Sequence, residues 1–199
     1  MFPRRDDREY GPWLDRLAGL LQPGLTALEL GCGLEDDARL LAIWGPGVIG
    51  LDRDLDRVRQ AARRVRAARF VVAALTAPLP FRDATVDLVV ASLSLHYFDH
   101  QTTAAIVDEI RRVLREGGRL LARVNAVGDR QSAYGVGIEL EPDVFEVEPG
   151  HIKRFFTPAS LRELLEPAFT IETLVEEETT SRYQDTKQTL VVRARRSPR

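Results

Sequence analysis

The sequence has a single cysteine, few lysines and no long apolar run. The one cysteine, Cys32, allows no disulfide within the chain and cannot build a cysteine metal site. The three histidines lack the H-E-x-x-H spacing of a zinc-binding helix, so we expect no metal. No stretch of about 18 apolar residues exists, and the first residues, MFPRRDDREYG, lack the apolar core of a secretion signal. We therefore expect a cytoplasmic protein without a membrane span.

Lysine is scarce although basic residues are common. Only two of the 28 basic residues are lysines, Lys153 and Lys187, and the other 26 are arginines. We interpret this scarcity as a matter of base composition rather than of function. The net charge of −2 gives no reason to expect nucleic acid as a partner. The arginines of residues 55–69 lie opposite an apolar stripe, as on an ordinary amphipathic helix with a solvated polar face.

Patterns typical of buried strands alternate with helical patterns over the first 125 residues. Apolar runs predict strands at residues 25–30, 48–52, 70–73, 86–92 and 119–124. Amphipathic segments predict helices at residues 36–45, 55–69, with Asp54 as its N-cap, and 101–115, ended by Gly117-Gly118. Such alternation with short connections is typical of a parallel sheet covered by helices on both faces.

The last third of the chain has a different character. Residues 125–154 are rich in glycine and acidic residues and have weak periodicity, which predicts a loop or partly helical insert over the sheet edge. Thr157 and Pro158 predict the cap and first turn of a short helix. The β-rich segments at 169–177 and 186–194 predict an antiparallel pair that completes the sheet.

The segment after the first predicted strand has the features of a nucleotide-binding loop. Gly31-Cys32-Gly33 allows a ligand to approach the backbone closely, and Cys32 is expected to be a small buried residue rather than a nucleophile. Asp36 stands where a dinucleotide-binding fingerprint has its third glycine. Asp52 ends the second strand, where a carboxylate either accepts hydrogen bonds from both ribose hydroxyls or caps the next turn. Loop and aspartate together favour a nucleoside ligand.

The sequence resembles class I S-adenosylmethionine-dependent methyltransferases of the methyltransferase-11 type. The resemblance is carried by LELGCG, VIGLD, LPFRDATVDLVVASLSLHYF and EIRRVLREGGRLLARVN, in this order. The later HIKRFFTPASL is similar to tellurite-resistance-type small-molecule methyltransferases. The resemblance implies a Rossmann-like three-layer α/β sandwich, in which a seven-stranded, mostly parallel sheet has an antiparallel last strand. It also implies S-adenosylmethionine as cofactor and a small-molecule methyl acceptor, with neither nucleic acid nor membrane as partner, in a monomer or homodimer.

The resemblance assigns roles to the residues that match these motifs. Glu29 and the glycine loop line the methionine part of the cofactor, and the residues after the fourth strand face the reactive methyl group. Asp52 binds the ribose, while Arg53, Ala74 and Leu75 lie beside the adenine. The expected cofactor-binding set is Glu29, Gly31, Cys32, Gly33, Asp52, Arg53, Ala74, Leu75, Ser92 and Leu93. We expect one domain over residues 1–199, with an N-terminal helical segment at 1–24 and an insert near the acceptor site at 125–156.

Two departures from the family pattern keep a second function open. The family usually has glycine where Glu35 stands, so Glu35 either crowds the cofactor or points to solvent at a helix start, where its charge is favourable. The family often has aspartate where Ala74 stands, and loss of its hydrogen bond to adenine weakens binding by about 1 kcal/mol. The alternative is a degenerate methyltransferase-fold protein that acts as a binding or partner module. Asp36 argues against a third possibility, a nicotinamide-dependent oxidoreductase.

His96 is the candidate general base. A sulfonium methyl group is already activated, so the enzyme mainly has to align the reacting atoms in a dry pocket. A base helps only where the acceptor must first lose a proton, and His96 otherwise anchors its loop. We interpret Tyr97 and Phe98 as packing residues. Tyr10 and Trp13 precede the first strand on a predicted helix, which either covers the cofactor as a lid or packs on the sheet.

Four residues flank the region where the acceptor is expected: Arg123, Asn125, Tyr134 and Arg154. The two arginines can hold an anionic acceptor through bidentate contacts. They can equally be neutralised by the acidic residues between 139 and 148, and we favour that structural pairing.

Overall fold

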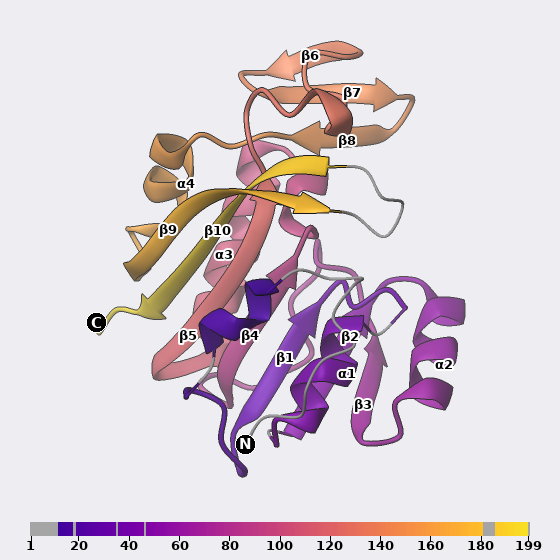
Figure 1. Cartoon of the computed structure of the whole chain (residues 1–199), viewed down its shortest axis with the longest axis vertical. Helices are drawn as coiled ribbons and strands as arrows, with labels where there is room; N and C mark the ends of the chain where they lie inside the picture. Colours follow the sequence, from indigo (N-terminus) through magenta and orange to yellow (C-terminus); the bar gives the residue numbers. More distant parts are fainter. Residues whose placement is uncertain (1–11, 18, 35, 46, 181–185, 199) are drawn as a thin grey trace.

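A seven-stranded sheet forms the centre of the computed structural model, which describes residues 12–17, 19–34, 36–45, 47–180 and 186–198 (Figure 1). The strand order is β3-β2-β1-β4-β5-β10-β9. The first five strands are parallel, and β10 runs antiparallel to both β5 and β9, which confirms the predicted sheet. The strands are β1 (Thr26–Leu30), β2 (Gly47–Asp52), β3 (Ala68–Val72), β4 (Val86–Ser92), β5 (Leu114–Asn125), β9 (Phe169–Thr180) and β10 (Thr186–Arg196).

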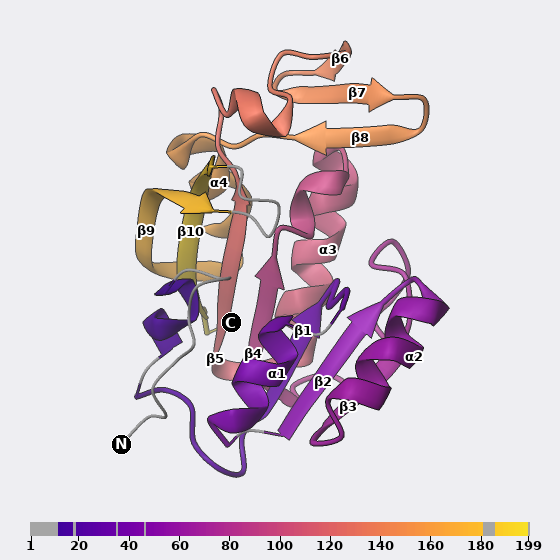
Figure 2. The ribbon, with the colours of Figure 1, turned by 45° about the vertical axis from the view of Figure 1, so that its right-hand side comes forward.

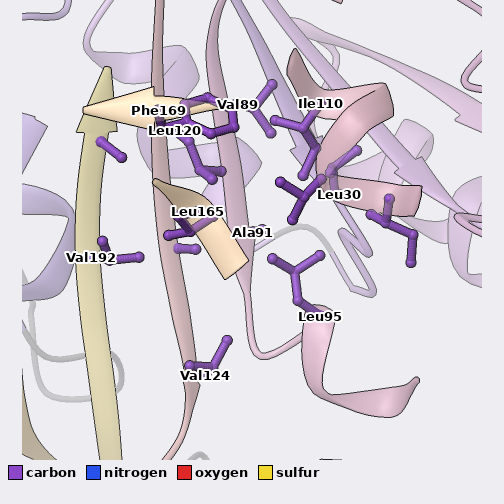
Figure 3. Close-up of a cluster of buried hydrophobic side chains, with 14 of the residues drawn as sticks. Leu30, Val89, Ala91, Leu95, Ile110, Leu120, Val124, Leu165, Phe169 and Val192 are labelled. Atoms are coloured by element: carbon purple, nitrogen blue, oxygen red, sulfur yellow. The ribbon is translucent and has the colours of Figure 1, made fainter. Parts of the chain in front are cut away.

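Helices cover both faces of this sheet and make the fold three layers thick (Figure 2). On one face, Trp13, Leu14 and Leu17 of a 3-10 helix pack with apolar residues of α1. On the other face, α3 and α4 supply residues such as Ile110 and Leu165 to the larger buried cluster in Figure 3. The helices are η1 (Pro12–Leu17), α1 (Asp36–Ile43), α2 (Leu55–Arg64), η2 (Leu95–Tyr97), α3 (His100–Val113), η3 (Arg130–Ser132) and α4 (Pro158–Leu165). No helix among the described residues is both long and apolar enough to cross a bilayer.

Side-chain caps set the starts of the helices. The Asp54 carboxylate accepts hydrogen bonds from the first-turn amides of α2, as the sequence predicts. Thr157 and Ser160 form a reciprocal capping box at α4, with Pro158 in its first turn. The end of α3 is predicted less well. The helix stops at Val113, and Gly117-Gly118 lie inside β5 rather than at the helix end.

The insert after β5 is a small sheet, so the prediction of a loop or partly helical segment is wrong. Three antiparallel strands follow one another, β6 (Ile138–Glu141), β7 (Val144–Glu148) and β8 (His151–Arg154). In β6 the apolar residues Ile138 and Leu140 alternate with glutamates, as in a half-buried strand, but both are exposed. Figures 1 and 2 show this sheet standing beyond the end of β5.

The two ends of the insert are hydrogen-bonded to each other. The Phe156 amide donates to the Asn125 carbonyl at 2.9 Å, and the Val127 amide donates to the Phe156 carbonyl at 3.0 Å. The Ala126 amide donates to the Gln188 carbonyl at 3.0 Å, which joins this point to the start of β10. The end of β5, the end of β8 and the start of β10 therefore meet at one place.

Residues 73–85 connect β3 to β4 without a helix, and Arg112 of α3 holds this connection. Its guanidinium donates to the Phe81 carbonyl at 2.8 Å and the Leu79 carbonyl at 3.0 Å. The Leu79 amide in turn donates to the Glu109 carboxylate at 2.7 Å. Glu109 and Arg112 of α3 therefore position residues 73–85, which include the residues expected beside the adenine.

The order of the strands fixes where a ligand can bind. The chain passes from β1 through α1 to β2 on one side, and from β4 through α3 to β5 on the other. The direction of winding therefore reverses between β1 and β4. Ligands of open α/β sheets bind outside the carboxyl ends of the strands at such a switch point. The segments after β1, β2 and β4 are the ones to inspect.

Candidate functional site

The loop after β1 folds back over the end of β2. The Gly31 and Cys32 amides both donate to the Leu51 carbonyl, at 2.7 and 3.0 Å. Gly31 and Gly33 have φ of +68° and +52°, the left-handed region that favours glycine. A Cβ placed on Gly33 would have no atom within 4 Å, so the backbone there borders open space.

Asp52 joins this loop to the end of β2. Its Oδ2 accepts a hydrogen bond from the Gly33 amide at 2.9 Å, and its Oδ1 accepts one from the Asp54 amide at 2.9 Å. The carboxylate therefore caps the next turn, which was one of the two alternatives for this residue, and it also fixes the glycine loop. Each carboxylate oxygen can accept a second hydrogen bond. Arg53, the next residue, is exposed.

The turn after β4 lies against the loop after β1. A Cβ placed on Gly31 would lie 2.8 Å from the Ser94 Cβ, so the two segments are in close contact. Leu93 has φ of +51°, an uncommon conformation for an apolar side chain, and its amide donates to the Arg123 carbonyl at 2.8 Å. The Ser92 hydroxyl accepts a hydrogen bond from the Arg123 guanidinium at 2.8 Å. Backbone strain of this kind gathers at functional sites.

The remaining residues of the predicted cofactor set differ in exposure. Glu29 in β1 and Cys32 after it are buried, while Ala74 and Leu75 after β3 are half-buried. Leu75 packs against the larger core cluster. Glu35 and Tyr10, for which the sequence left two roles open, lie outside the described residues.

His96 is buried at the turn after β4. It is 3% exposed, and its Nδ1 has no hydrogen-bond partner in the described part of the chain. Burial, together with the charges of Lys187, Lys153 and Arg123, lowers the pKa of His96 to about 3. The imidazole is therefore neutral at physiological pH and a weak base. Its ring lies 4.4 Å from that of Tyr97, which is exposed.

The low pKa of His96 makes the stability of the fold depend on pH. The unfolded chain binds a proton near pH 6.5 and the folded chain only near pH 3, so stability present above pH 6.5 is lost as the pH falls. When the pH falls from 7.5 to 5, the free energy of unfolding of the wild type should decrease by about 2 kcal/mol more than that of the His96→Gln variant. Urea unfolding at the two pH values measures this difference. His151→Gln, at an exposed histidine, is the matched control, and equal losses in wild type and His96→Gln would contradict the prediction.

Arg123 and Asn125 lie at the end of β5, near this turn. Arg123 is buried, and its guanidinium carbon stands 4.7 Å from the centre of the Trp13 ring. Trp13 is itself buried in the core and donates from its indole to Asp37, so it packs on the sheet rather than acting as a lid. The Asn125 Oδ1 is buried and has no hydrogen-bond partner among the described residues.

Tyr134 and Arg154 belong to the insert. The Tyr134 hydroxyl donates to Asp143 at 3.2 Å, and burial together with that carboxylate raises the pKa of Tyr134. Arg154 is buried with its guanidinium carbon 4.4 Å from the centre of the Phe156 ring. Its Nε and Nη1 have no hydrogen-bond partner in the described structure, and burial lowers its pKa.

The acidic residues of the insert do not form an ion pair with Arg154 in the part of the chain that is described, so the pairing that we favoured from the sequence is wrong there. Instead they serve the insert and its neighbours. Glu141 lies 3.6 Å from His100, and Glu148 lies 3.6 Å from His151. Glu146 accepts from the Gly150 amide at 2.8 Å. Arg154 retains its positive charge, and the nearby carboxylates only oppose the lowering of its pKa.

Sequence reasoning missed three residues near His96. Ser94 is buried against the glycine loop, and Lys153 and Lys187 act electrostatically on the His96 ring. Ser94 belongs to a quoted motif, so its position after β4 was the available signal. The two lysines come from separate strands of low periodicity, and only their scarcity could have drawn attention to them.

Two further features of the described residues delimit the site. No group of three or more histidine, cysteine or acidic side chains there could hold a metal ion. A hollow of about 220 Å³ lies at the opposite edge of the sheet, between Leu25, Leu88 and Gly117. That edge carries the amino ends of β1 and β4, so it is not where a doubly wound sheet binds its ligand.

Comparison with known proteins gives this geometry a context. The methyltransferase domain family model matches residues 28–122. An uncharacterized methyltransferase from Synechocystis sp. is 34% identical over 105 residues, which are 53% of this chain and 48% of that protein. The chain thus spans about half the length of this curated relative.

Solved structures resemble the whole described fold. A SAM-dependent methyltransferase from Methanosarcina mazei superposes with a TM-score of 0.78 at 23% identity, over 96% of this chain and 100% of that one. The 1,6-didemethyltoxoflavin-N1-methyltransferase of Burkholderia thailandensis, solved with 1,6-didemethyltoxoflavin and S-adenosylhomocysteine, superposes with a TM-score of 0.74 at 22% identity. It covers 94% of this chain and 77% of that one. These likenesses confirm the predicted Rossmann-like fold.

Proposed function

We infer that this chain, of which residues 28–122 match the methyltransferase domain family model, transfers a methyl group from S-adenosylmethionine to a small molecule. The family match confirms the resemblance that the four sequence motifs indicate. The activity of the chain, its cofactor and the nature of its acceptor are our proposal. The matched relatives do not support the degenerate alternative, which is one outcome of the test below.

The observation that carries this function is the meeting of three segments at the switch point. The glycine loop after β1 contacts both the Asp52 carboxylate at the end of β2 and the turn containing Ser94 after β4. Open space beside Gly33 and the spare acceptor capacity of Asp52 suit a nucleoside with free ribose hydroxyls. The Burkholderia thailandensis enzyme, whose fold is similar, was solved with the spent form of this cofactor.

Each residue then has a role that follows from its place. Gly31 and Gly33 let the backbone approach the methionine part, and Asp52 accepts hydrogen bonds from the ribose. Half-buried Ala74 and Leu75, with Arg53, border the adenine. The contact between Gly31 and Ser94 closes the site on the side of β4.

S-adenosylmethionine supplies a sulfonium methyl group that needs no further activation by the protein. The chain contributes alignment and exclusion of water, which are the main requirements of such a transfer. Neutral His96 is too weak a base to remove a proton from a weakly acidic acceptor at neutral pH. His96 instead lines the site as an uncharged residue. Because no general base is then available from His96, the acceptor atom must already be nucleophilic.

Calorimetric titration with S-adenosylmethionine and S-adenosylhomocysteine tests the proposal. We expect micromolar dissociation constants for both ligands, because the glycine loop and Asp52 are already in place. NADH is the control ligand, and it should not bind because Asp36 replaces the third glycine of a dinucleotide loop. Absence of binding at millimolar S-adenosylhomocysteine, in protein with a cooperative unfolding transition, would overturn the assignment in favour of the degenerate module.

A further inference from the structure

The only two lysines of the chain both act electrostatically on the same buried histidine, His96. Lys153 is on β8 and Lys187 is on β10, and both side chains are half-buried. Their charges act on His96 together with that of Arg123, and Lys187 also acts on Lys153. With 26 arginines elsewhere in the chain, a coincidence of both lysines at one place calls for a reason other than base composition.

The backbone explains how the lysines come together. The start of β10 is joined to the end of β5, where Thr189 pairs with Asn125. Side chains of a strand alternate between its faces, so Lys187 lies on the same face as Thr189 and Asn125. Ala126 forms a bridge to Phe156, which brings the end of β8 to the same place.

Contacts with the neighbouring turns complete the arrangement. β8 contacts η2, the turn that contains His96. The Lys153 ammonium donates to the Ser132 carbonyl of η3 at 3.1 Å. The lysines thus lie at the carboxyl end of β5. The turn after β4 lies between them and the glycine loop.

The positive charges of this cluster are not neutralised within the described chain. Lys153, Lys187 and Arg154 have no carboxylate within ion-pair distance among the described residues. Asp129 and Glu148 act on Lys153 from farther away, but burial and the charge of Lys187 outweigh them and lower its pKa. Partly buried like charges without counter-ions are unfavourable, so an arrangement of this kind fits a site that receives a negative charge from outside.

Buried polar atoms of the turns after β4 and β5, and of the end of β5, also lack partners. The hydroxyls of Ser94 and Ser132 and the Asn125 Oδ1 are buried and have no hydrogen-bond partner among the described residues. Such groups are nearly always satisfied in a folded protein, by protein, water or ligand. They indicate a polar ligand rather than an apolar one, since the two hydroxyls can donate to an anionic oxygen and the Asn125 Oδ1 can accept from a donor elsewhere on the same molecule.

We propose that Lys153 and Lys187 bind an anionic group, a carboxylate or a phosphate, carried by the methyl acceptor. The proposal rests on the proposed function, because it places the acceptor next to the cofactor loop. Compact ammonium groups can each meet a separate oxygen, whereas the rigid fork of arginine prefers two oxygens in one plane.

The anionic group is an anchor and not the atom that receives the methyl group. An oxygen whose lone pairs accept hydrogen bonds from two ammonium groups is a poor nucleophile. Methylation of that oxygen would also remove the charge that binds it. The acceptor therefore carries two features, an anionic group at the lysines and a separate neutral nucleophile that is directed toward the turn after β4.

Titration of small anions tests this proposal without knowledge of the acceptor. Sodium acetate and inorganic phosphate are titrated at low ionic strength into protein saturated with S-adenosylhomocysteine, and binding is followed by heteronuclear NMR. We expect binding in the millimolar range, weakened about tenfold in Lys153→Gln and in Lys187→Gln. Acetamide, which has the size of acetate but no charge, should not bind. Stronger binding of acetate indicates a carboxylate acceptor, and stronger binding of phosphate indicates a phosphorylated one.

Matched controls separate this proposal from its premise. Arg59→Gln removes an exposed positive charge on α2 and should leave anion binding unchanged. Thermal unfolding of each variant shows that it remains folded. Equal anion affinity in wild type and both lysine variants would overturn the lysine proposal, as would an absence of binding to the wild type. S-adenosylhomocysteine affinity is measured in the same samples without anion, so failure of the methyltransferase assignment is detected independently.

Discussion

Replacement of Asp52 with asparagine should weaken S-adenosylhomocysteine binding by about 100-fold, measured by calorimetry, since hydrogen bonds to charged groups contribute about 1.5–3 kcal/mol each. The carboxylate accepts from the Gly33 and Asp54 amides at the same time. An asparagine has one acceptor oxygen and one amino group, so one of the two backbone amides would face a donor. The variant therefore loses a ribose acceptor and also releases the glycine loop.

The control for this variant is Asp56→Asn. Asp56 lies only four residues after Asp52 but is exposed in the first turn of α2, outside the site. Its carboxylate lies 3.5 Å from the Arg59 guanidinium. Its affinity for S-adenosylhomocysteine should stay within twofold of the wild type. An Asp52→Asn protein that binds as tightly as Asp56→Asn would mean that the carboxylate serves only the turn.

Replacement of Gly31 with alanine should destabilise the fold by about 2–4 kcal/mol. The residue has φ of +68°, which costs an L-amino acid about 1–2 kcal/mol. Its new Cβ would also lie 2.8 Å from the Ser94 Cβ, so the turn after β4 would have to move. Thermal unfolding should show a midpoint lower by roughly 5–15 °C, because each kcal/mol shifts a chain of this size by about 2–4 °C.

Gly33→Ala separates strain from the steric contact. Gly33 has a similar φ of +52°, but no atom lies within 4 Å of the position of its new Cβ. The free energy of unfolding of this variant should decrease only by the cost of the left-handed backbone conformation, about 1–2 kcal/mol. If Gly33→Ala were as unstable as Gly31→Ala, contact between the two loops would not contribute, and the proposed closure of the site beside Ser94 would lose its basis.

The parallel half of the fold could be predicted because its signals are local. Each central strand is buried on both faces, so it is a short apolar run that ends in a turn residue, and Asp52 follows such a run directly. Asp54 and Thr157 cap helices through contacts within three residues, which sequence spacing describes well. Strands that are buried and parallel must place their carboxyl ends together, so the glycine loop and Asp52 could be assigned to one site.

The insert and the lysine cluster could not be predicted because their signals are long-range. The strands of the insert are only four or five residues long, so the alternation of apolar and polar residues within each is too short to distinguish a strand from a loop. Lys153 and Lys187 come near each other only because the end of β8 and the start of β10 both lie beside Ala126. Arg154 seemed to belong with the acidic residues near it in sequence, but those residues form contacts with their own turns.

The closed ends of the insert have a consequence for how such a protein can change. The chain leaves the main sheet at Asn125 and returns at Phe156, and the two points are already hydrogen-bonded to each other. Residues between them can be lengthened, shortened or exchanged as a cassette, since neither β5 nor α4 has to shift to accommodate a new length. A graft of this segment would carry Lys153 with it and leave Asp52 and the glycine loop in the recipient untouched. Selectivity for the acceptor could then be transplanted between related chains while the machinery that holds the methyl donor stays the same.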